Sequence, residues 1–314
     1  MEIALHLLLL VVGLGIALVA SDRAVNYTRA LAAALGAPPF IVGVVLVSIG
    51  TDLPEIANSI AAHAQDEGDV NVGDSVGSTL TQYTFVLGLF PLVVAVVAID
   101  RREVGLVSVL TMGGLALTSI FVADGWLGRW EGAALVFSWA LATLAVVRLL
   151  PSHAPPDAPP AVVIRNRLGQ VGIVLVALAF VGAGATVAVR ALVQLAEAAG
   201  VPEFVIAFFG ASMGTSAPEI VVDVTALLRG APGIALGDAL GSSLVDATLS
   251  IGVGPLVFPA EVTARLALAG SLYALVAVGV VGALLAARRR HDRWSGLVLG
   301  GLYLLSYVVI IRIA

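Results

Sequence analysis

The chain has 314 residues, of which 60% are hydrophobic and only 12% carry a charge, and its formal net charge is −5. Soluble domains carry about 25% charged residues, so this composition excludes an ordinary soluble protein. The mean hydropathy of +1.06 indicates an integral membrane protein instead. The chain has no Cys, which excludes disulfide bonds and thiolate metal sites.

Apolar runs long enough to cross a bilayer, about 20 residues each, recur along the whole chain. We expect ten spans, at about 3–20, 37–62, 70–95, 103–123, 131–149, 170–196, 201–228, 233–258, 263–286 and 294–312. The start, Met1-Glu2-Ile3, has no basic segment, so the first run is expected to remain as a helix. The predicted fold is an all-α integral membrane protein with about ten transmembrane helices.

The orientation in the membrane follows from the arginines, since all 16 basic residues are Arg. With the N-terminus outside, twelve of the 16 fall in cytoplasmic loops and four on the other face. Cytoplasmic loops are normally the ones enriched in basic residues. We therefore expect a multi-pass protein of the plasma membrane with both termini outside.

A single linker-like stretch divides the chain into two halves. Residues 151–160 read Pro-Ser-His-Ala-Pro-Pro-Asp-Ala-Pro-Pro, a composition typical of a stiff connector. The predicted domains are a first five-helix repeat at 1–150, a cytoplasmic linker at 151–169, and a second five-helix repeat at 170–314.

Two stretches of the chain have nearly the same sequence. The first holds Gly-Thr-Asp-Leu-Pro-Glu at 50–55 and Gly-Asp-Ser-Val-Gly-Ser at 73–78. The second holds Gly-Thr-Ser-Ala-Pro-Glu at 214–219 and Gly-Asp-Ala-Leu-Gly-Ser at 237–242, an offset of 164 residues at each position. Carboxylates at bilayer depth are costly and mark functional sites.

The spacing of the two stretches also predicts how they are related. They begin in the second and seventh expected spans, which are five helices apart. Because five is an odd number, the second stretch enters the membrane from the opposite side. The sequence therefore predicts two inverted-topology five-helix repeats whose motifs meet near the membrane midplane, as in many secondary transporters.

Each motif contains a proline that frees a backbone carbonyl. Pro54 and Pro218 have no N–H, so the carbonyl groups of Gly50 and Gly214, four residues earlier, lose their helical partners. Carbonyl groups freed within a bilayer must find other partners. Lining a cation site would satisfy them.

Carboxylates and hydroxyls adjoin these freed carbonyls. Glu55 and Glu219 directly follow the prolines, and the hydroxyls of Thr51 and Thr215 lie one turn away. An all-oxygen site with two negative charges suits a hard cation such as Ca²⁺ or Na⁺. Zn²⁺ or Cu²⁺ would call for His or Cys, and neither motif contains one.

The second part of each motif offers more oxygen atoms. Ser78 and Ser242 close the Gly-x-x-x-Gly-Ser segments, and Gln82 and Asp246 follow one helical turn later. Residues four apart share a helix face, so the amide and the carboxylate can supply further ligands from across the bundle.

Four other polar residues lie near the motifs. Asp74 and Asp238, one turn before the serines, could be direct ligands or could support the ligands. Asn58 and Asp223 each lie within a turn of a motif glutamate but have no repeat partner of like kind. For these two we expect a structural role.

The two units resemble the α-repeats of the Ca²⁺/cation antiporter superfamily, in particular its sodium/calcium exchanger branch. The pattern of that family is Gly-Thr-Ser-x-Pro-Glu, then Gly-Asn/Asp-x-x-Gly-Ser-Asn-x-x-Asn/Asp. The dense match covers about a fifth of the chain. The expected arrangement of ten helices extends the resemblance over the rest of the chain. The resemblance implies a secondary transporter, not an enzyme, that exchanges Ca²⁺ for Na⁺ by alternating access.

The resemblance also implies a ligand set. Glu55 and Glu219 would be the central ligands. Around them it places the side chains of Thr51, Thr215, Ser216, Ser78, Ser242 and Asp246. Ser48 and Ser212, one turn before the threonines, would offer backbone oxygens. The transported ions are the only bound species expected, without a cofactor or a nucleic-acid partner. The first and sixth spans are expected to slide against the rest.

The chain departs from the family pattern at several positions. Asp52 stands where the family usually has Ser, Gln82 where it often has Asn, and Thr79 and Ser243 where it often has Asn. We keep Asp52 and Gln82 in the predicted ligand set. Because Ser216, the repeat partner of Asp52, is neutral, Asp52 is a candidate proton carrier. An antiporter that exchanges Ca²⁺ or another cation for H⁺ is therefore the alternative.

A distant alternative is an intramembrane aspartyl protease, because Ala-Leu-Gly-Asp at 235–238 resembles that family's Gly-x-Gly-Asp element. That chemistry needs two aspartates that share a proton. The Gly-Asp here is itself repeated, and the chain has no Tyr-Asp or Pro-Ala-Leu element. The repeated Pro-Glu would also have no role in a protease.

Overall fold

The computed structural model describes residues 2–150, 167–198, 214 and 216–313. Within these ranges, seven helices are long and apolar enough to cross a membrane. They become eight if the helices at Pro39–Thr51 and Leu53–Ala64, which meet at a 45° bend, form one span. The protein is a multi-pass integral membrane protein. The expected span at 201–228 is described only in its second part, α11 (Ala217–Leu228).

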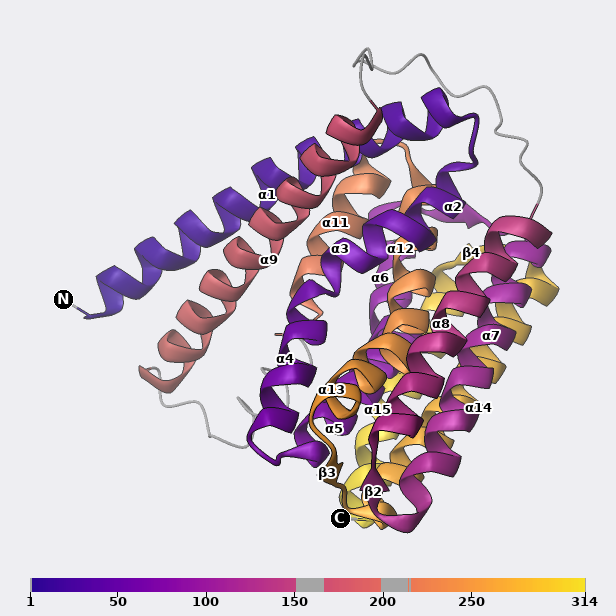
Figure 1. Ribbon diagram of the computed structural model, residues 1–314. Helices are drawn as coiled ribbons and strands as arrows, with labels where there is room; N and C mark the ends of the chain where they lie inside the picture. The colour runs from indigo at the N-terminus through magenta and orange to yellow at the C-terminus, as the bar shows by residue number, and fades with distance from the viewer. Residues whose placement is uncertain (1, 151–166, 199–213, 215, 314) are drawn as a thin grey trace.

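Two long helices form a pair at one side of the molecule (Figure 1). They are α1 (Glu2–Leu35) and α9 (Arg167–Ala198), the first and sixth expected spans. Small residues let their backbones approach closely: a Cβ atom built on Gly13 would lie 2.7 Å from the carbonyl oxygen of Gly184. Many large apolar side chains of α1 are exposed, which suits contact with lipid.

The helix that carries the first motif is broken in the middle. It runs through α2 (Pro39–Val42), a π-helical turn η1 (Gly43–Val47) and α3 (Ser48–Thr51), and it resumes as α4 (Leu53–Ala64). Asp52 lies at the break with φ −81° and ψ 4°. Because Pro54 cannot donate a hydrogen bond to Gly50, the regular helix cannot continue through this point.

The segments that follow the two motifs have matching elements. The first half contains α4, α5 (Gly68–Thr81), η2 (Gln82–Val86) and α6 (Leu87–Val93). The second half contains α11, α12 (Pro232–Val245), η4 (Asp246–Ser250) and α13 (Ile251–Val257). Each boundary in the second half lies 164 residues after its equivalent in the first half. The repeated sequence therefore folds into repeated local structure.

The matching helices α4 and α11 end at opposite ends of the molecule. α4 descends to the turn at the lower edge in Figure 1, where Gly68 approaches the backbone of Glu261. α11 ends beside the last part of α1 near the upper edge, where Arg229 forms an ion pair with Asp22 at 2.5 Å.

Four further helices and two short ribbons complete the structure. The helices are α7 (Arg101–Phe121), α8 (Arg129–Leu149), α14 (Ala264–Arg288) and α15 (Arg293–Ile313), and η3 (Val122–Asp124) follows α7. Strand β1 (Val96–Ala98) pairs antiparallel with β4 (Arg290–Asp292), and β2 (Trp126–Leu127) pairs antiparallel with β3 (Ala260–Glu261). Each ribbon joins a strand of the first half to one of the second, so the halves are interlocked.

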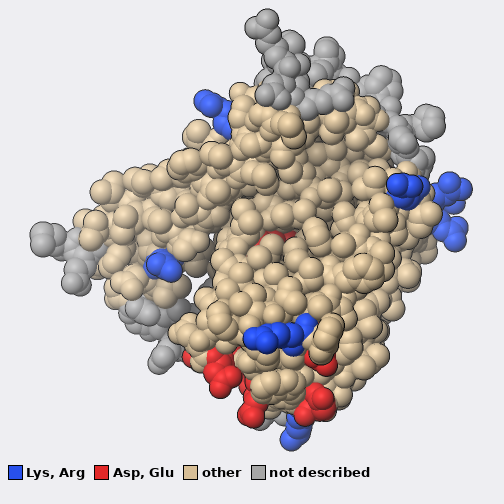
Figure 2. All heavy atoms as spheres, viewed as in Figure 1, with Lys and Arg blue, Asp and Glu red and all other residues tan. Residues whose placement is uncertain are grey.

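The buried core centres on α12, whose residues from Ile234 to Val245 are all buried. The outer surface is different. On the face shown in Figure 2, charged side chains gather mainly toward the lower and upper edges, and a broad uncharged band lies between them. Such a band is what a membrane-embedded surface requires. A few acidic atoms are visible inside a hollow in this band (Figure 2).

Candidate metal centre

The break at Asp52 places three residues of the first motif in the protein interior. The Asp52 N–H donates to the Ser48 carbonyl at 3.0 Å, and the Ile56 N–H donates to the Asp52 carbonyl at 3.0 Å. These bonds hold both sides of the bend although Pro54 has no N–H. Thr51, Asp52 and Glu55 are all at most 2% exposed.

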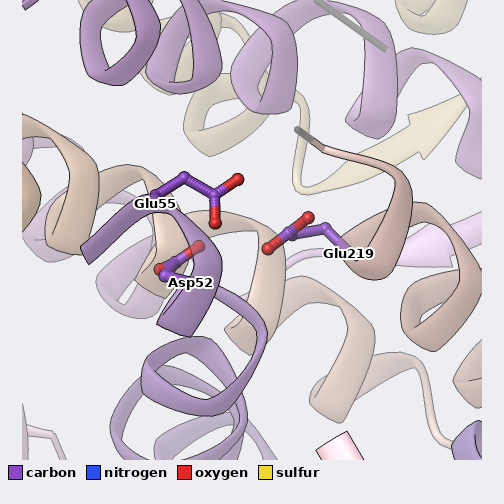
Figure 3. A group of neighbouring side chains, drawn as sticks. All are labelled: Asp52, Glu55 and Glu219. Carbon is purple, nitrogen blue, oxygen red and sulfur yellow. The ribbon is translucent and has the colours of Figure 1, made fainter. Parts of the chain in front are cut away.

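Three carboxylates from the two motifs converge at this bend. One oxygen from each of Asp52, Glu55 and Glu219 lies within 4.8 Å of the other two, and Figure 3 shows the three side chains pointing toward one another. None of their six oxygens has a hydrogen-bond partner among the described residues. Since Ca²⁺ binds oxygen at about 2.3–2.6 Å, two of its ligand oxygens can be about 5 Å apart. The geometry fits one hard cation.

A fourth carboxylate, that of Asp246, is held from across the bundle. Gln82 Nε2 donates to Asp246 Oδ2 at 3.3 Å, and Ser243 Oγ donates to Gln82 Oε1 at 2.9 Å. Asp246 Oδ1 is buried without a hydrogen-bond partner among the described residues. Gln82 therefore orients the carboxylate of Asp246, while the side-chain oxygen of Gln82 accepts a hydrogen bond from Ser243.

Thr51 links the first motif to α12 of the second half. Its Oγ1 atom lies 3.2 Å from Asp238 Oδ1 and 3.2 Å from Ser242 Oγ. The same hydroxyl is 3.1 Å from the backbone oxygen of Ser48. The hydroxyls of Thr51 and Ser242, which the sequence predicts as ligands, therefore lie together.

Most of the other predicted ligands can also be placed. Ser216 directly precedes α11 and has a fully buried Oγ without a hydrogen-bond partner among the described residues. Ser78 is 2% exposed and lines a cavity described below. Ser48 directs its hydroxyl back to the Val44 carbonyl at 2.6 Å. Ser212 and Thr215 lie outside the described residues.

A cavity of about 680 Å³ opens beside Glu55. Its polar lining comes from α4, α5 and α9, and consists of Glu55, Asn58, Asp69, Asp74, Ser78, Thr186 and Arg190. Within it, Asn58 Nδ2 donates to Asp74 Oδ2 at 2.8 Å. The sequence motifs do not reveal that α9 contributes Thr186 and Arg190, because that helix lies far away in the chain.

The equivalent helix of the second half is tightly packed. A Cβ atom on Gly73 or Gly77 of α5 would meet no atom of the described residues within 4 Å. A Cβ atom on Gly241 of α12 would lie 2.6 Å from the Cα of Val44, and one on Gly237 would collide with the Phe40 carbonyl. α12 is thus packed against α2 and η1, whereas among the described residues a cavity adjoins Glu55 on the side of α5.

The charge of the centre defines its chemistry. Asp52, Glu55, Glu219 and Asp246 together carry four negative charges when ionised, and each is at most 2% exposed. The ion pairs of the described part of the chain join other residues. Buried carboxylates need compensation by cations. All the donors are oxygen atoms, which favours hard cations over zinc or copper.

Comparison with known proteins identifies the family. The sodium/calcium exchanger protein family matches residues 5–148 and 169–312. A putative antiporter, CaxA of Alkalimonas amylolytica, is 31% identical over 92% of this chain and 93% of its own length. The inner membrane protein YrbG of Escherichia coli is 29% identical over 93% of both chains. The sodium/calcium exchanger MaX1 of Methanosarcina acetivorans is 26% identical over 99% of this chain and 100% of its own length.

Solved structures show the same fold. The sodium-calcium exchanger NCX_Mj, soaked with Na⁺ and Sr²⁺, superposes with a TM-score of 0.80 at 22% sequence identity, over 98% of this chain and 99% of that chain. These findings confirm the resemblance that the two motifs indicate. The chain belongs to the sodium/calcium exchanger family and is a membrane transport protein of the antiporter type.

Proposed function

We propose that the protein exchanges Ca²⁺ for Na⁺ across the plasma membrane by alternating access to one central site. The observation that carries this proposal is the convergence of Asp52, Glu55 and Glu219, with oxygens within 4.8 Å of one another and without other partners among the described residues. The name of the relative MaX1, a sodium/calcium exchanger, supports the choice of ions.

Glu55 and Glu219 act as the central ligands in this proposal, since each half contributes one of them. The surrounding oxygens come from Thr51, Asp52, Ser78, Gln82, Thr215, Ser216, Ser242 and Asp246, with backbone oxygens of Ser48 and Ser212. Ca²⁺ takes six to eight oxygen ligands in a flexible arrangement. Na⁺ ions would use overlapping subsets of the same atoms, so the two cations exclude each other.

We infer two inverted five-helix halves, at 1–150 and 170–314, with both termini outside. The opposite placement of the ends of α4 and α11 supports this topology. In that orientation, the cavity beside Glu55 faces the outside. The end of α11 faces the cytoplasm, where Arg29 donates to the Arg229 carbonyl at 3.0 Å and Asp22 pairs with Arg229.

Charge compensation explains why the movement of Ca²⁺ would be coupled to the movement of Na⁺. Carboxylates that repel one another in a buried site oppose closure, whereas a bound Ca²⁺ or several Na⁺ ions neutralise them. Closure and reopening toward the cytoplasm therefore require bound cations. The pair α1 and α9, packed together at the side of the bundle (Figure 1), is the element that would slide during this change.

Asp52 favours H⁺ as the second candidate counter-ion. With Asp52, the centre holds four carboxylates, two more negative charges than one Ca²⁺ compensates. Neighbouring carboxylates in a dry site do not all remain ionised without cations. Protons could therefore take the place of sodium ions.

Flux through reconstituted protein tests the proposal. ⁴⁵Ca²⁺ uptake into proteoliposomes should follow an imposed Na⁺ gradient and should be weak under a pH gradient alone. Calorimetry should show that Ca²⁺ and Na⁺ compete. Uptake driven only by the pH gradient would establish the H⁺ alternative, and simultaneous tight binding of Ca²⁺ and a full load of Na⁺ would refute the single site. Peptide cleavage without Ca²⁺ flux would instead indicate an aspartyl protease.

A further inference from the structure

A groove lies between α1 and α9, away from the central carboxylates. It has a volume of about 940 Å³, and every residue that lines it belongs to one of these two helices. Its walls are large apolar side chains, each between 41% and 63% exposed: Val12, Ile16, Val19, Ile173, Val176 and Phe180. Because α1 and α9 stand at the side of the bundle (Figure 1), these side chains face the lipid.

Glycines on both helices keep the groove empty of protein. A Cβ atom built on Gly15 of α1 or on Gly172 of α9 would meet no atom of the described residues within 4 Å. At the crossing point of the same helices, by contrast, a Cβ atom on Gly13 would lie 2.7 Å from the Gly184 carbonyl oxygen. The helices therefore touch at their crossing point and leave space beside it. An unfilled space forfeits van der Waals contacts, and acyl chains are the apolar groups that a bilayer supplies.

One end of the groove is polar. Intervals of three or four residues place five of the lining residues on one face of α1: Val12, Ile16, Val19, Arg23 and Tyr27. The apolar stripe thus ends in a guanidinium group and a phenol hydroxyl. Arg23 is exposed and takes part in none of the ion pairs found among the described residues. Its positive charge is therefore available to an anionic group at this end.

The length of the groove matches one leaflet of a bilayer. Val12 and Arg23 are eleven residues apart, which is about 16 Å along the helix axis. Half of the hydrocarbon core of a bilayer is about 15 Å thick. A lipid whose acyl chain lies in the apolar part of the groove therefore brings its phosphate group to Arg23.

The equivalent positions on α9 lack this polar end. The 164-residue offset of the repeats relates Arg23 to Val187 and Tyr27 to Ala191. Neither an isopropyl nor a methyl side chain can bind a phosphate group. The repeat therefore does not impose the polar end, which is specific to α1.

We propose that this groove binds one anionic phospholipid, with an acyl chain between α1 and α9 and the phosphate group on Arg23 and Tyr27. Basic pockets between transmembrane helices are known to bind anionic headgroups. One uncompensated positive charge matches one net negative charge, which selects phosphatidylglycerol over the zwitterionic phosphatidylcholine. In the proposed orientation the lipid belongs to the cytoplasmic leaflet, since Asp22, next to Arg23, pairs with Arg229 at that end.

Native mass spectrometry of the purified full chain tests the headgroup contact. Wild type titrated with phosphatidylglycerol in detergent should retain one lipid, and phosphatidylcholine with the same acyl chains should bind about fivefold more weakly or worse. Arg23→Gln should reduce the affinity for phosphatidylglycerol by about fivefold or more and remove the preference. Arg148→Gln, which removes an exposed arginine in the last turn of α8, is the matched control and should leave both affinities unchanged.

Gly15→Leu tests the apolar part of the groove. The position is open, so the variant should fold, yet its side chain fills the groove and should displace the lipid although Arg23 is intact. Gly301→Leu on α15, where a Cβ atom also meets no atom of the described residues within 4 Å, is the control and should retain the lipid.

Three results would overturn the proposal. Equal affinity of the wild type for the two lipids would show that the groove does not select an anionic headgroup. Unchanged phosphatidylglycerol binding in Arg23→Gln would remove the phosphate contact, and unchanged binding in Gly15→Leu would show that Arg23 binds phosphate without the groove. The bound lipid is counted without any ion flux, so these results do not depend on which ions the protein exchanges.

Discussion

The two repeat units share their backbone boundaries but differ in packing and charge. Around α4 and α5, a cavity reaches Glu55, and no described residue lies within 4 Å of a Cβ atom built on Gly73 or Gly77. Around α11 and α12, the equivalent glycines press against α2 and η1, and the interior contains an additional carboxylate, Asp223. Repeated sequence therefore produces the same local fold in both units, whereas the packing around the described helices and the buried charge differ.

The largest effect is expected when one central carboxylate is removed from each unit in turn. Glu55→Gln and Glu219→Gln should each reduce Ca²⁺ flux by more than about 100-fold, because loss of one partner from a buried ion cluster costs about 3–5 kcal/mol. The measurement is ⁴⁵Ca²⁺ uptake into proteoliposomes, with folding checked by gel filtration in detergent. Glu67→Gln in the exposed α4–α5 turn is the control. Normal flux in either central variant would falsify the ligand assignment.

Equivalent glycines in the two units test the difference in packing. Gly237→Ala should lower the melting temperature, because its methyl group collides with the Phe40 carbonyl and overpacking typically costs about 1–3 kcal/mol. Gly73→Ala should leave it unchanged or raise it slightly, since the methyl group meets no atom of the described residues within 4 Å and Ala favours helix. Thermal unfolding in detergent measures both. Equal shifts would contradict this difference in packing.

An exchange of charge between the two motifs tests the role of Asp52. Asp52→Ser should flatten the pH dependence of Ca²⁺ exchange between about pH 6 and 8, because the centre then has one carboxylate fewer to neutralise. Ser216→Asp in the other motif, combined with Asp52→Ser, should restore part of that dependence. Flux is measured at several pH values under a fixed Na⁺ gradient. A profile of Asp52→Ser that overlays the wild type would show that Asp52 takes no part in coupling.

The smallest predicted effect is a pH dependence of stability that arises from His291, in the loop that joins α14 to α15. Because Pro91 has no N–H, the Leu87 carbonyl lacks its helical partner, and His291 Nε2 lies 2.6 Å from that carbonyl oxygen instead. Burial lowers the pKa of His291. The unfolded chain therefore binds a proton near its ordinary pKa of about 6.5 while the folded chain does not, and stability falls as the pH drops below that value.

The melting temperature of the wild type should accordingly decrease by a few degrees between pH 7 and pH 5, beyond any decrease seen in His291→Gln. The amide of Gln can still donate to the Leu87 carbonyl but does not titrate in this range. Differential scanning fluorimetry on both proteins provides the comparison. Parallel curves would show that His291 does not titrate within this window.

Much of the centre could be predicted from the sequence. The repeated Pro-Glu inside apolar segments indicates Glu55 and Glu219, and the 3.6-residue period of a helix indicates that Ser242 and Asp246 share a face. These inferences need only local geometry. The Pro54 break and the matching helix boundaries follow for the same reason, since each depends on residues that are close in the chain.

Other features depend on contacts between distant segments, and the sequence alone leaves them undetermined. Thr51 bonds to Asp238 across 187 residues, and Gln82 bonds to Asp246 across 164 residues. The repeats also share the Pro-Glu and Gly-x-x-x-Gly-Ser elements, although the described packing around the glycines of α5 and α12 differs. A repeated motif is compatible with access from either side, and only the tertiary structure shows that α12 packs on α2 and η1 with backbone atoms in contact, which leaves no room for an ion between them.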